Sequence, residues 1–246
     1  MTVGVARTTS ASMGAMTRRI VLTGAGRGLG RALAERWVAE GDEVWGCTRS
    51  GTSTVALAGC VAMDLADEAS ITTGAAVLAE QLDAVDLLVN CAGVDARAFG
   101  SADDNRGPFD LDAATFSAVI NVNVTGPMVL TRALLPLLQR GTSATVVNIS
   151  SQLGSLQVAA TQGRDTAYCV SKAALNMLSV KSAAALRADG IAVVMLHPGW
   201  VQTDMGGSDA ALTVAQSADA IVRTVADLVL ADSGRFIRWD GVEHPW

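Results

Sequence analysis

The sequence predicts one α/β domain in which helices cover both faces of a parallel sheet of about seven strands. Short apolar segments recur along the chain, segments of helical periodicity lie between most of them, and the apolar segments are apolar on both faces of a strand. The chain has 246 residues, of which 50% are hydrophobic, enough to fill a large core. We therefore expect a doubly wound (Rossmann) domain over residues 17–246, with ligands beyond the carboxyl ends of its strands.

The predicted strands are short apolar runs that end at glycine or polar residues. They cover residues 18–23, 43–48, 60–64, 86–90, 144–150 and 191–197, and a last strand is expected at 235–239. Helical periodicity predicts a helix at 31–40 that Gly41 ends, and a long helix at 166–190 that Gly190 ends. A second long helix is expected at about 113–139.

The first sixteen residues are small and polar, and we interpret them as a disordered tail; a transit peptide is the alternative. We find no apolar run of about eighteen residues, so we expect a soluble cytoplasmic protein with no membrane partner. The net charge of −6 and the lack of a Lys or Arg run exclude a nucleic-acid footprint. The cysteines form no CxxC pair, which predicts buried thiols and neither a metal site nor a disulfide framework. These are Cys47, Cys60, Cys91 and Cys169.

A glycine-rich turn, TGAGRGLG at residues 23–30, follows the first predicted strand and precedes a helix. Gly24 permits a sharp turn, Gly28 lets the backbone approach a pyrophosphate, and Gly30 allows close helix packing. Amides at the start of the helix would face the anion. The strand before the turn and the helix after it favour a dinucleotide site over a simple chain reversal.

The region after the second strand favours NADP(H) over NAD(H). An NAD site usually has a carboxylate there that binds the ribose hydroxyls, but no Asp or Glu occurs from Val44 to Met63. Arg49 lies just past that strand and Arg27 lies in the glycine turn, and guanidinium groups suit a 2′-phosphate. The alternative for either arginine is a solvated surface charge.

Tyr168 is the only tyrosine of the chain, and Lys172 follows it at the spacing that stacks two side chains on one helix face. A nearby ammonium group favours the phenolate, so Lys172 is predicted to lower the pKa of Tyr168. A phenol with such a pKa could transfer a proton near neutral pH. The alternative is an amphipathic tyrosine beside an exposed lysine.

Six motifs occur in a fixed order from about residue 17 onward: TGAGRGLG, NCAG (90–93), NVNVTG (121–126), NISSQLG (148–154), YCVSK (168–172) and HPGWVQTDM (197–205). Together they resemble the short-chain dehydrogenase/reductase family. The last motif and the closing DGVEHPW look most like the branch of carbonyl reductases and C-factor-like proteins. The resemblance implies a homodimer or homotetramer assembled through the two long central helices.

The resemblance implies four catalytic residues. Tyr168 would protonate the substrate oxygen, and Lys172 would hold the nicotinamide ribose and lower the pKa of Tyr168. Ser151 would hydrogen-bond the substrate carbonyl, with Ser150 as the alternative on the other side of the strand. Asn123 would hold a water between Lys172 and solvent, and a helix kink near Pro127 is its alternative explanation.

The resemblance also implies positions that contact the cofactor, in addition to the turn residues, Arg49, Tyr168 and Lys172. Leu29 belongs to the glycine turn. The others are Asp64 and Leu65 beside the adenine, Asn90, Ala92 and Gly93 against the adenosine ribose, and Pro198, Gly199, Val201 and Thr203 around the nicotinamide and phosphates. His197 precedes that last segment, and we assign it a structural role.

The pocket walls are expected to include Gln152, Leu153, Trp200 and Met205, with the loop 94–110 nearby. This mixed lining favours a medium-sized ketone or aldehyde. The stretch between Ser151 and Tyr168 is a few residues longer than in most family members and carries TQGRD at 161–165, which puts the local pocket wall in doubt.

Two functions are compatible with these observations. The first is an NADPH-dependent oxidoreductase that reduces a ketone or aldehyde, or oxidises the matching alcohol, with Tyr168 as acid and base. The second is a catalytically silent regulatory protein that senses NADP(H). The enzyme is favoured, since a sensor has no need to keep Asn123, Ser151, Tyr168 and Lys172 together.

Overall fold

Seven parallel strands form the sheet in the computed structural model, which describes residues 17–102, 106–161 and 163–246. The predicted tail at 1–16 lies outside these residues. The strands run in the order β3-β2-β1-β4-β5-β6-β7, as in a doubly wound fold. They are β1 (Arg19–Thr23), β2 (Glu43–Thr48), β3 (Gly59–Ala62), β4 (Leu87–Asn90), β5 (Thr145–Ile149), β6 (Ala192–His197) and β7 (Phe236–Arg238). The predicted fold class is confirmed, and each predicted strand forms within two residues of its expected bounds.

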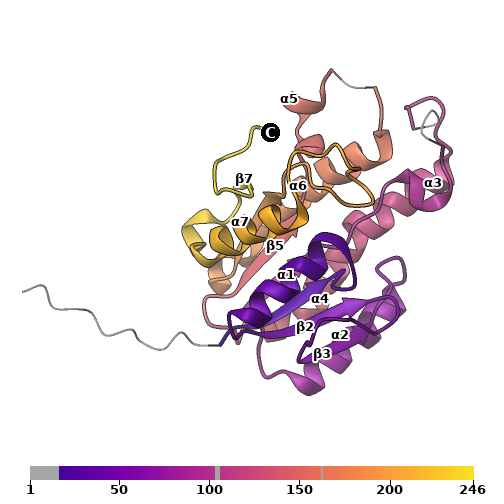
Figure 1. Cartoon of the computed structure of the whole chain (residues 1–246). Coiled ribbons are helices and arrows are strands. Elements are labelled where there is room, and N and C mark those ends of the chain that lie inside the picture. Colours follow the sequence, from indigo (N-terminus) through magenta and orange to yellow (C-terminus); the bar gives the residue numbers. More distant parts are fainter. Residues whose placement is uncertain (1–16, 103–105, 162) are drawn as a thin grey trace, which may run out of the picture.

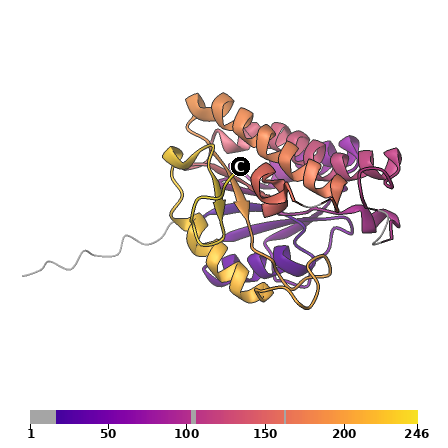
Figure 2. The ribbon, with the colours of Figure 1, turned by 90° about the horizontal axis from the view of Figure 1, so that it is seen from above.

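Helices cover both faces of this sheet, as the strand patterns predicted (Figures 1 and 2). One face carries α2 (Glu68–Gln81), α4 (Gly126–Leu138) and α6 (Thr166–Leu186), and the other carries α1 (Gly28–Ala39) and α7 (Val214–Ala226). In Figure 2, α4 and α6 lie on one side of the strands and α1 and α7 on the other. Shorter elements are η1 (Ala96–Phe99), α3 (Ala113–Ile120), η3 (Gln152–Gly154), α5 (Leu156–Ala159), η4 (Arg187–Asp189) and η5 (Leu230–Asp232).

Each face buries its own apolar cluster against the sheet. Leu78 of α2 and Leu130 of α4 pack on one face, while Trp37 of α1 and Ile221 of α7 pack on the other, and all four are fully buried. Burying a large apolar side chain contributes about 1.5–3 kcal/mol. The core therefore fixes the sheet and leaves the carboxyl ends of its strands for the loops.

The predicted long helix at about 113–139 is confirmed as one helical run over Ala113–Leu138, but it contains a π-helical segment that the sequence did not predict. A π-helical segment, η2 (Asn121–Thr125), separates α3 from α4. The Asn121 side chain donates to the carbonyl of Ala66 at 2.7 Å, and Asn123 bonds the backbone of Val94. Both asparagines of the π-helical segment thus contact distant loops, and π-helical segments are often found at functional sites.

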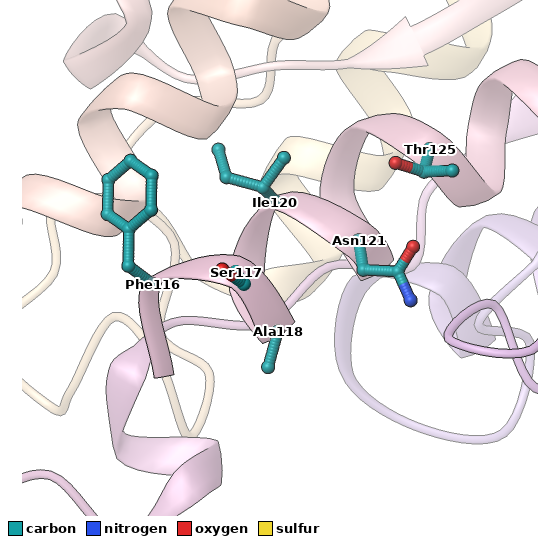
Figure 3. Close-up of a pocket in the computed structure, with 6 residues that line it drawn as sticks. All are labelled: Phe116, Ser117, Ala118, Ile120, Asn121 and Thr125. Atoms are coloured by element: carbon teal, nitrogen blue, oxygen red, sulfur yellow. The ribbon is translucent and has the colours of Figure 1, made fainter. Parts of the chain in front are cut away.

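Figure 3 is a close-up of a hollow along α3 and η2. Its lining comes from the helix itself: Phe116, Ser117, Ala118, Ile120, Asn121 and Thr125. The hollow contains none of the residues that the motifs assign to catalysis.

The helical run Ala113–Leu138 bears on the expectation that the chain has no membrane span. By length and composition it could cross a membrane, with a mean hydropathy of 1.3 in its most apolar window. Core helices pass the same test, and Leu130, Leu134 and Leu137 are buried against the sheet here. The run is therefore weak evidence for a membrane.

The cysteines are all free thiols, but only Cys47 among them is buried. Burial raises the pKa of the Cys47 thiol to about 12. Cys60, Cys91 and Cys169 are partly exposed, so the prediction of four buried thiols was wrong for three of them.

Both histidines of the chain lie in one aromatic cluster at the carboxyl end of the sheet. His197 ends β6, and its ring centroid is 5.2 Å from that of His244, which packs edge-on against Phe236. Both histidines are buried, with Nδ1 of His197 and Nε2 of His244 lacking a partner. Burial lowers the pKa of His197 to about 3 and also lowers that of His244. This packing supports a structural role for His197.

We predict that acid destabilises the protein through this cluster. The folded-state pKa of His197 lies below its unfolded value of about 6.5, so the unfolded state binds the proton more readily and stability falls as the pH drops below 6.5. His197 alone should lower the free energy of unfolding by about 2 kcal/mol between pH 7 and pH 5. Urea unfolding at several pH values measures this loss. A His197→Gln, His244→Gln double variant should have a flatter profile, and an equal slope in both proteins would contradict the assignment.

Candidate active site

The segments that the six motifs mark converge at the carboxyl edge of the sheet. The glycine turn follows β1, the NCAG loop follows β4, Ser151 follows β5, and the segment from Pro198 follows β6. Parallel strands place all these ends on one edge, where ligands of doubly wound sheets bind. Figure 1 shows α5 and the C-terminal end beside the same region, and the amide of Gln157 donates to the carbonyl of Trp246 at 2.9 Å.

The glycine turn has the geometry that an anion site requires. Gly24 and Gly28 have φ values of 76° and 52°, a region that favours glycine. A Cβ on Gly30 would lie 2.3 Å from the carbonyl oxygen of Gly24, so the helix meets the turn too closely for a side chain. The helix starts at Gly28, three residues earlier than predicted, and the side chain of its N-cap residue Arg27 makes no capping bond. The first-turn amides are thus available to a phosphate, while Leu29 packs on the core.

The two arginines proposed for the 2′-phosphate are both exposed, and they differ in their contacts. Arg27 Nη1 lies 2.5 Å from Asp204, so this ion pair spans the glycine turn and the segment after β6. Arg49 makes no ion pair with the part of the chain that the structure describes. Both groups are within the turn regions where an adenosine phosphate would lie.

The loops after β3 and β4 bring the remaining adenosine-side residues to this edge. Asp64 is exposed and Leu65 is buried, and Leu65 contacts the start of α4 at Gly126. Thr23 Oγ1 accepts bonds from the amides of Cys91 and Ala92 at 3.0 and 3.1 Å, which holds the NCAG loop against β1.

Asn90 is buried and donates to Asn148 Oδ1 at 2.8 Å, while its own Oδ1 has no partner. A Cβ on Gly93 would lie 3.4 Å from both Asn123 Oδ1 and Lys172 Nζ. The loop therefore runs from the adenosine side to the catalytic side of the edge, and these residues fit a bound dinucleotide.

The segment after β6 folds back over the glycine turn. Pro198 accepts a bond from Ser217 at 2.7 Å, and Gly199 has a φ of 88° with Leu212 in the space of a side chain. Val201 forms a β-bridge with Leu212, and Thr203 Cγ2 lies 3.6 Å from the Cβ position of Gly28. The predicted nicotinamide segment is thus next to the predicted pyrophosphate site.

Tyr168, Lys172 and Ser151 meet at the end of β5. Ser151 Oγ accepts a bond from the amide of Leu153 at 3.1 Å, and its hydroxyl lies close enough to the Tyr168 phenol to lower the pKa of that phenol. Lys172 is 3% exposed, and its Nζ donates to the carbonyl of Ile149 at 2.8 Å. The same Nζ lies 5.6 Å from the centroid of the Tyr168 ring.

The alternative serine lies elsewhere. Ser150 is 1% exposed and donates to Asn176 Oδ1 at 2.6 Å, within the interface between β5 and α6. The geometry places Ser151, and not Ser150, beside the phenol.

Asn123 connects the π segment to α6. Its Oδ1 accepts from the amide of Val94 at 2.8 Å, and its Nδ2 donates to the carbonyl of Val94 at 2.8 Å and to Ser171 Oγ at 2.9 Å. Ser171 in turn donates to the carbonyl of Tyr168 at 2.7 Å. Asn123 therefore joins the loop after β4 to the first turn of α6. That Asn123 also binds a water between Lys172 and solvent stays a prediction.

The expected effect of Lys172 on the pKa of Tyr168 is another prediction that the structure corrects. Burial raises the pKa of Tyr168, and the nearby Ser151 hydroxyl opposes this only in part. Burial also lowers the pKa of Lys172 to about 8. Sequence spacing indicates that the two side chains are neighbours, but it does not show how far each is removed from water: Lys172 is buried and Tyr168 is partly buried. Without ligand the phenol is protonated, the form that can donate a proton.

Other predicted wall residues occupy the rim of this region. Gln152 and Leu153 form η3 and are partly buried, and Met205 is also partly buried. Trp200 is exposed and donates to the carbonyl of Gly206 at 2.8 Å.

The sequence reasoning missed three charged residues near Tyr168, namely Asp95, Arg97 and Arg106. Asp95 and Arg106 are buried, and Arg97 donates to the carbonyl of Met205 at 2.8 Å. Arg97 pairs with Asp95 two residues away, but no local pattern shows that this pair and Arg106 reach the distant residues Met205 and Asp165.

Comparison with known proteins shows the family. The family model described as short chain dehydrogenase matches residues 18–212. The C-signal protein of Myxococcus xanthus is 42% identical over 164 residues, which cover 66% of this chain and 93% of the relative. The chain belongs to the short-chain dehydrogenase/reductase family, which is a family of oxidoreductases.

Solved structures agree with this assignment. The NADPH-bound carbonyl reductase from chicken fatty liver superposes with a TM-score of 0.82 at 30% identity, covering 94% of this chain and 99% of that one. Carbonyl reductase Sniffer of D. melanogaster gives 0.80 at 27% identity, covering 94% and 100%. Among other solved relatives, one contains NADP and another a partially ordered NAD. The family therefore establishes a nicotinamide dinucleotide and leaves the choice between the two open.

Proposed function

We propose that this protein is an NADP(H)-dependent oxidoreductase that reduces a ketone or aldehyde, or oxidises the matching alcohol. The observation that carries the proposal is the meeting of Tyr168 with Ser151 and the buried Lys172, on the sheet edge that also carries the glycine turn. Two hydroxyl groups and one cation are the groups that a carbonyl needs as it gains negative charge. A small-molecule substrate is therefore the expected partner.

Each side chain has a distinct task in this proposal. The hydroxyls of Ser151 and Tyr168 hold the carbonyl oxygen, and Tyr168 gives it a proton as charge develops. Lys172, anchored on Ile149, keeps a positive charge next to the phenol at neutral pH because its pKa is about 8. Bound NADPH would supply the hydride. Asn123 holds α6 in place through Ser171 and would keep a path for reprotonation of Tyr168.

The preference for NADP(H) rests on charge. The stretch from Val44 to Met63 has no carboxylate to bind ribose hydroxyls, while Arg49 is exposed and without an ion pair among the described residues. Arg27 would exchange Asp204 for the 2′-phosphate. The NADPH-bound chicken carbonyl reductase supports the same choice.

The rim residues favour a medium-sized, partly apolar substrate. Leu153 and Met205 are partly buried at the edge, and Trp200 has 51% of its surface exposed although its Nε1 is already bonded. Such surfaces suit a ketone or aldehyde with an apolar body.

A second candidate is a catalytically silent regulatory protein that senses NADP(H). The relative at 42% identity carries the name C-signal, which favours a signalling role for that protein. Turnover distinguishes the two candidates, since a sensor binds the dinucleotide without consuming it.

We also propose that the chain forms a homodimer or homotetramer in the cytoplasm. A groove between α4 and α6 is lined by side chains of both helices, and Met128 and Met177 of these helices are exposed. Burial of such apolar side chains by a second copy would stabilise an assembly. The free thiols suit a reducing compartment.

We predict that Tyr168→Phe keeps NADPH binding but lowers turnover of a carbonyl substrate by roughly two to four orders of magnitude, because the proton donor is lost. Consumption of NADPH with a panel of ketones and aldehydes measures turnover, and fluorescence of bound NADPH measures binding.

Ser150→Ala is the matched control for Ser151→Ala, and of these two variants only Ser151→Ala should lose activity. Unchanged turnover in Tyr168→Phe would remove the proposed mechanism.

We predict that Arg49→Ala weakens NADPH binding by about tenfold or more and leaves NADH binding nearly unchanged, because one charge-assisted contact contributes about 1.5–3 kcal/mol. Calorimetric titration with both dinucleotides measures the two affinities. Arg36→Ala, on the far side of α1, is a control that should change neither. An equal loss for both dinucleotides in Arg49→Ala would contradict a contact with the 2′-phosphate.

A further inference from the structure

Two loops that the sequence marks separately meet just before the catalytic tyrosine. Arg106, from the loop after β4, has its Nη1 2.7 Å from Asp165 Oδ1, at the end of the insertion between Ser151 and Tyr168. The amide of Thr166 donates to the carbonyl of Arg106 at 3.0 Å. Backbone and side chain of Arg106 therefore both hold the first turn of α6.

The charge of Arg106 is buried between two carboxylates. The residue is 7% exposed, and its Nη1 lies 2.7 Å from Asp165 and 4.0 Å from Asp95 Oδ2. Burying a charge is unfavourable unless opposite charges and hydrogen bonds compensate it. The two carboxylates therefore help to hold Arg106 in place, and Arg106 helps to hold the two carboxylates.

Asp165 differs from an ordinary N-cap residue in its backbone conformation and in the partner of its side chain. It is the N-cap residue of α6, its φ is 58°, and its carboxylate makes no capping bond. An N-cap aspartate normally accepts a bond from a first-turn amide. Here the carboxylate faces Arg106 instead, and a left-handed non-glycine residue of this kind persists only where its surroundings hold it.

Asp95 extends the same cluster to the pocket rim. Its Oδ2 accepts bonds from Nε and Nη2 of Arg97 at 2.9 and 2.6 Å, and Arg97 Nη2 also donates to the carbonyl of Met205 at 2.8 Å. The cluster therefore joins the segments after β4 and β6 to the start of α6.

Asp165 lies in the turn of α6 that precedes Tyr168, since the amide of Cys169 donates to its carbonyl at 2.9 Å, so its charge lies within one turn of the phenol. Burial is the main reason that the pKa of Tyr168 is raised, and the negative charges of Asp95 and Asp165 raise it further. A guanidinium paired with a carboxylate weakens the field of that carboxylate on its surroundings. The other groups that face the phenol are the Ser151 hydroxyl, the Cys169 thiol and the Lys172 ammonium.

We propose that Arg106 is a positioning residue for the acid and base chemistry of Tyr168, tying the loop after β4 to the first turn of α6 and offsetting the charges of Asp95 and Asp165 beside the phenol. The proposal rests on the proposed function only in that it takes Tyr168 as the proton donor. It makes the protonation of Tyr168 depend on a charge from the pocket wall as well as on Lys172.

The sole tyrosine permits a direct test that needs no activity. Replacing it by 3,5-difluorotyrosine labels the site alone, and fluorine beside the hydroxyl makes the phenol acidic enough to titrate while the protein is folded. The ¹⁹F chemical shift against pH gives the midpoint of ionisation in the ligand-free protein. The proteins compared are the labelled parent and its Arg106→Gln, Arg106→Lys and Asp165→Asn variants.

The expected shifts have opposite signs. Arg106→Gln removes the cation that pairs with Asp165 and lies near Asp95, which stays bonded to Arg97, and it should raise the midpoint by about half a pH unit or more. Asp165→Asn removes a carboxylate and should lower the midpoint. Arg106→Lys keeps the charge and should stay near the parent. Both Arg106→Gln and Asp165→Asn break the same ion pair, so a merely structural role would move both midpoints in the same direction. Shifts of the same sign, no shift, or an Arg106→Lys that behaves like Arg106→Gln would overturn the proposal.

Controls separate this test from folding and from the proposed function. Arg19→Gln breaks another ion pair, Arg19 with Asp86 at 2.9 Å, at the opposite edge of the sheet, and should leave the midpoint unchanged. If Arg106→Gln does not fold, the single variant Asp95→Asn is measured in its place. Asp95→Asn and Asp165→Asn must then each lower the midpoint. A protein that consumes no NADPH with any carbonyl would refute the proposed function, while the fluorine midpoints still decide the role of Arg106.

Discussion

The site depends on the burial of one ammonium group at the carboxyl end of β5. Lys172 is 3% exposed and bonds the carbonyl of Ile149 at 2.8 Å, and the preceding residue, Ser171, is bonded to Asn123 at 2.9 Å. Two consecutive side chains thus fix the rotation of α6 from two sides. That rotation places Tyr168, one turn earlier, beside Ser151. The cost of removing the cation from water is visible in the lowered pKa of Lys172.

The helix α6 docks on the sheet through several polar groups as well as apolar ones, whereas α1 buries apolar residues and glycine alone. Helix α6 buries Ser171, Lys172, Asn176 and Ser179. Asn148 of β5 donates to Ser179 at 2.7 Å and accepts from Asn90 of β4 at 2.8 Å. Buried polar networks cost stability when a partner is missing, so they permit few alternative registers. Apolar packing would tolerate a rotation of α6 that this network does not.

Local sequence patterns predicted the fold because the strands and glycine turns are encoded locally. The strands are apolar runs between polar ends, and TGAGRGLG contains its own positive φ positions at Gly24 and Gly28. The π segment was missed because Asn123, which lies in it, bonds Val94, a residue 29 positions away that local patterns do not reveal as a partner. The direction of the Tyr168 pKa was missed because spacing shows neighbours but not burial. The cluster around Arg106 was missed since its partners come from separate loops.

The chain has two lysines, so NMR of ¹³C-labelled lysine side chains tests the central claim most directly, with exposed Lys181 as the reference signal. The account predicts that Lys172 in the ligand-free protein titrates with a midpoint near 8, well below the ordinary value of 10.5, because its ammonium is buried against Ile149. A midpoint at or above 10.5 would show that Lys172 is solvated, and would contradict the geometry on which the site depends.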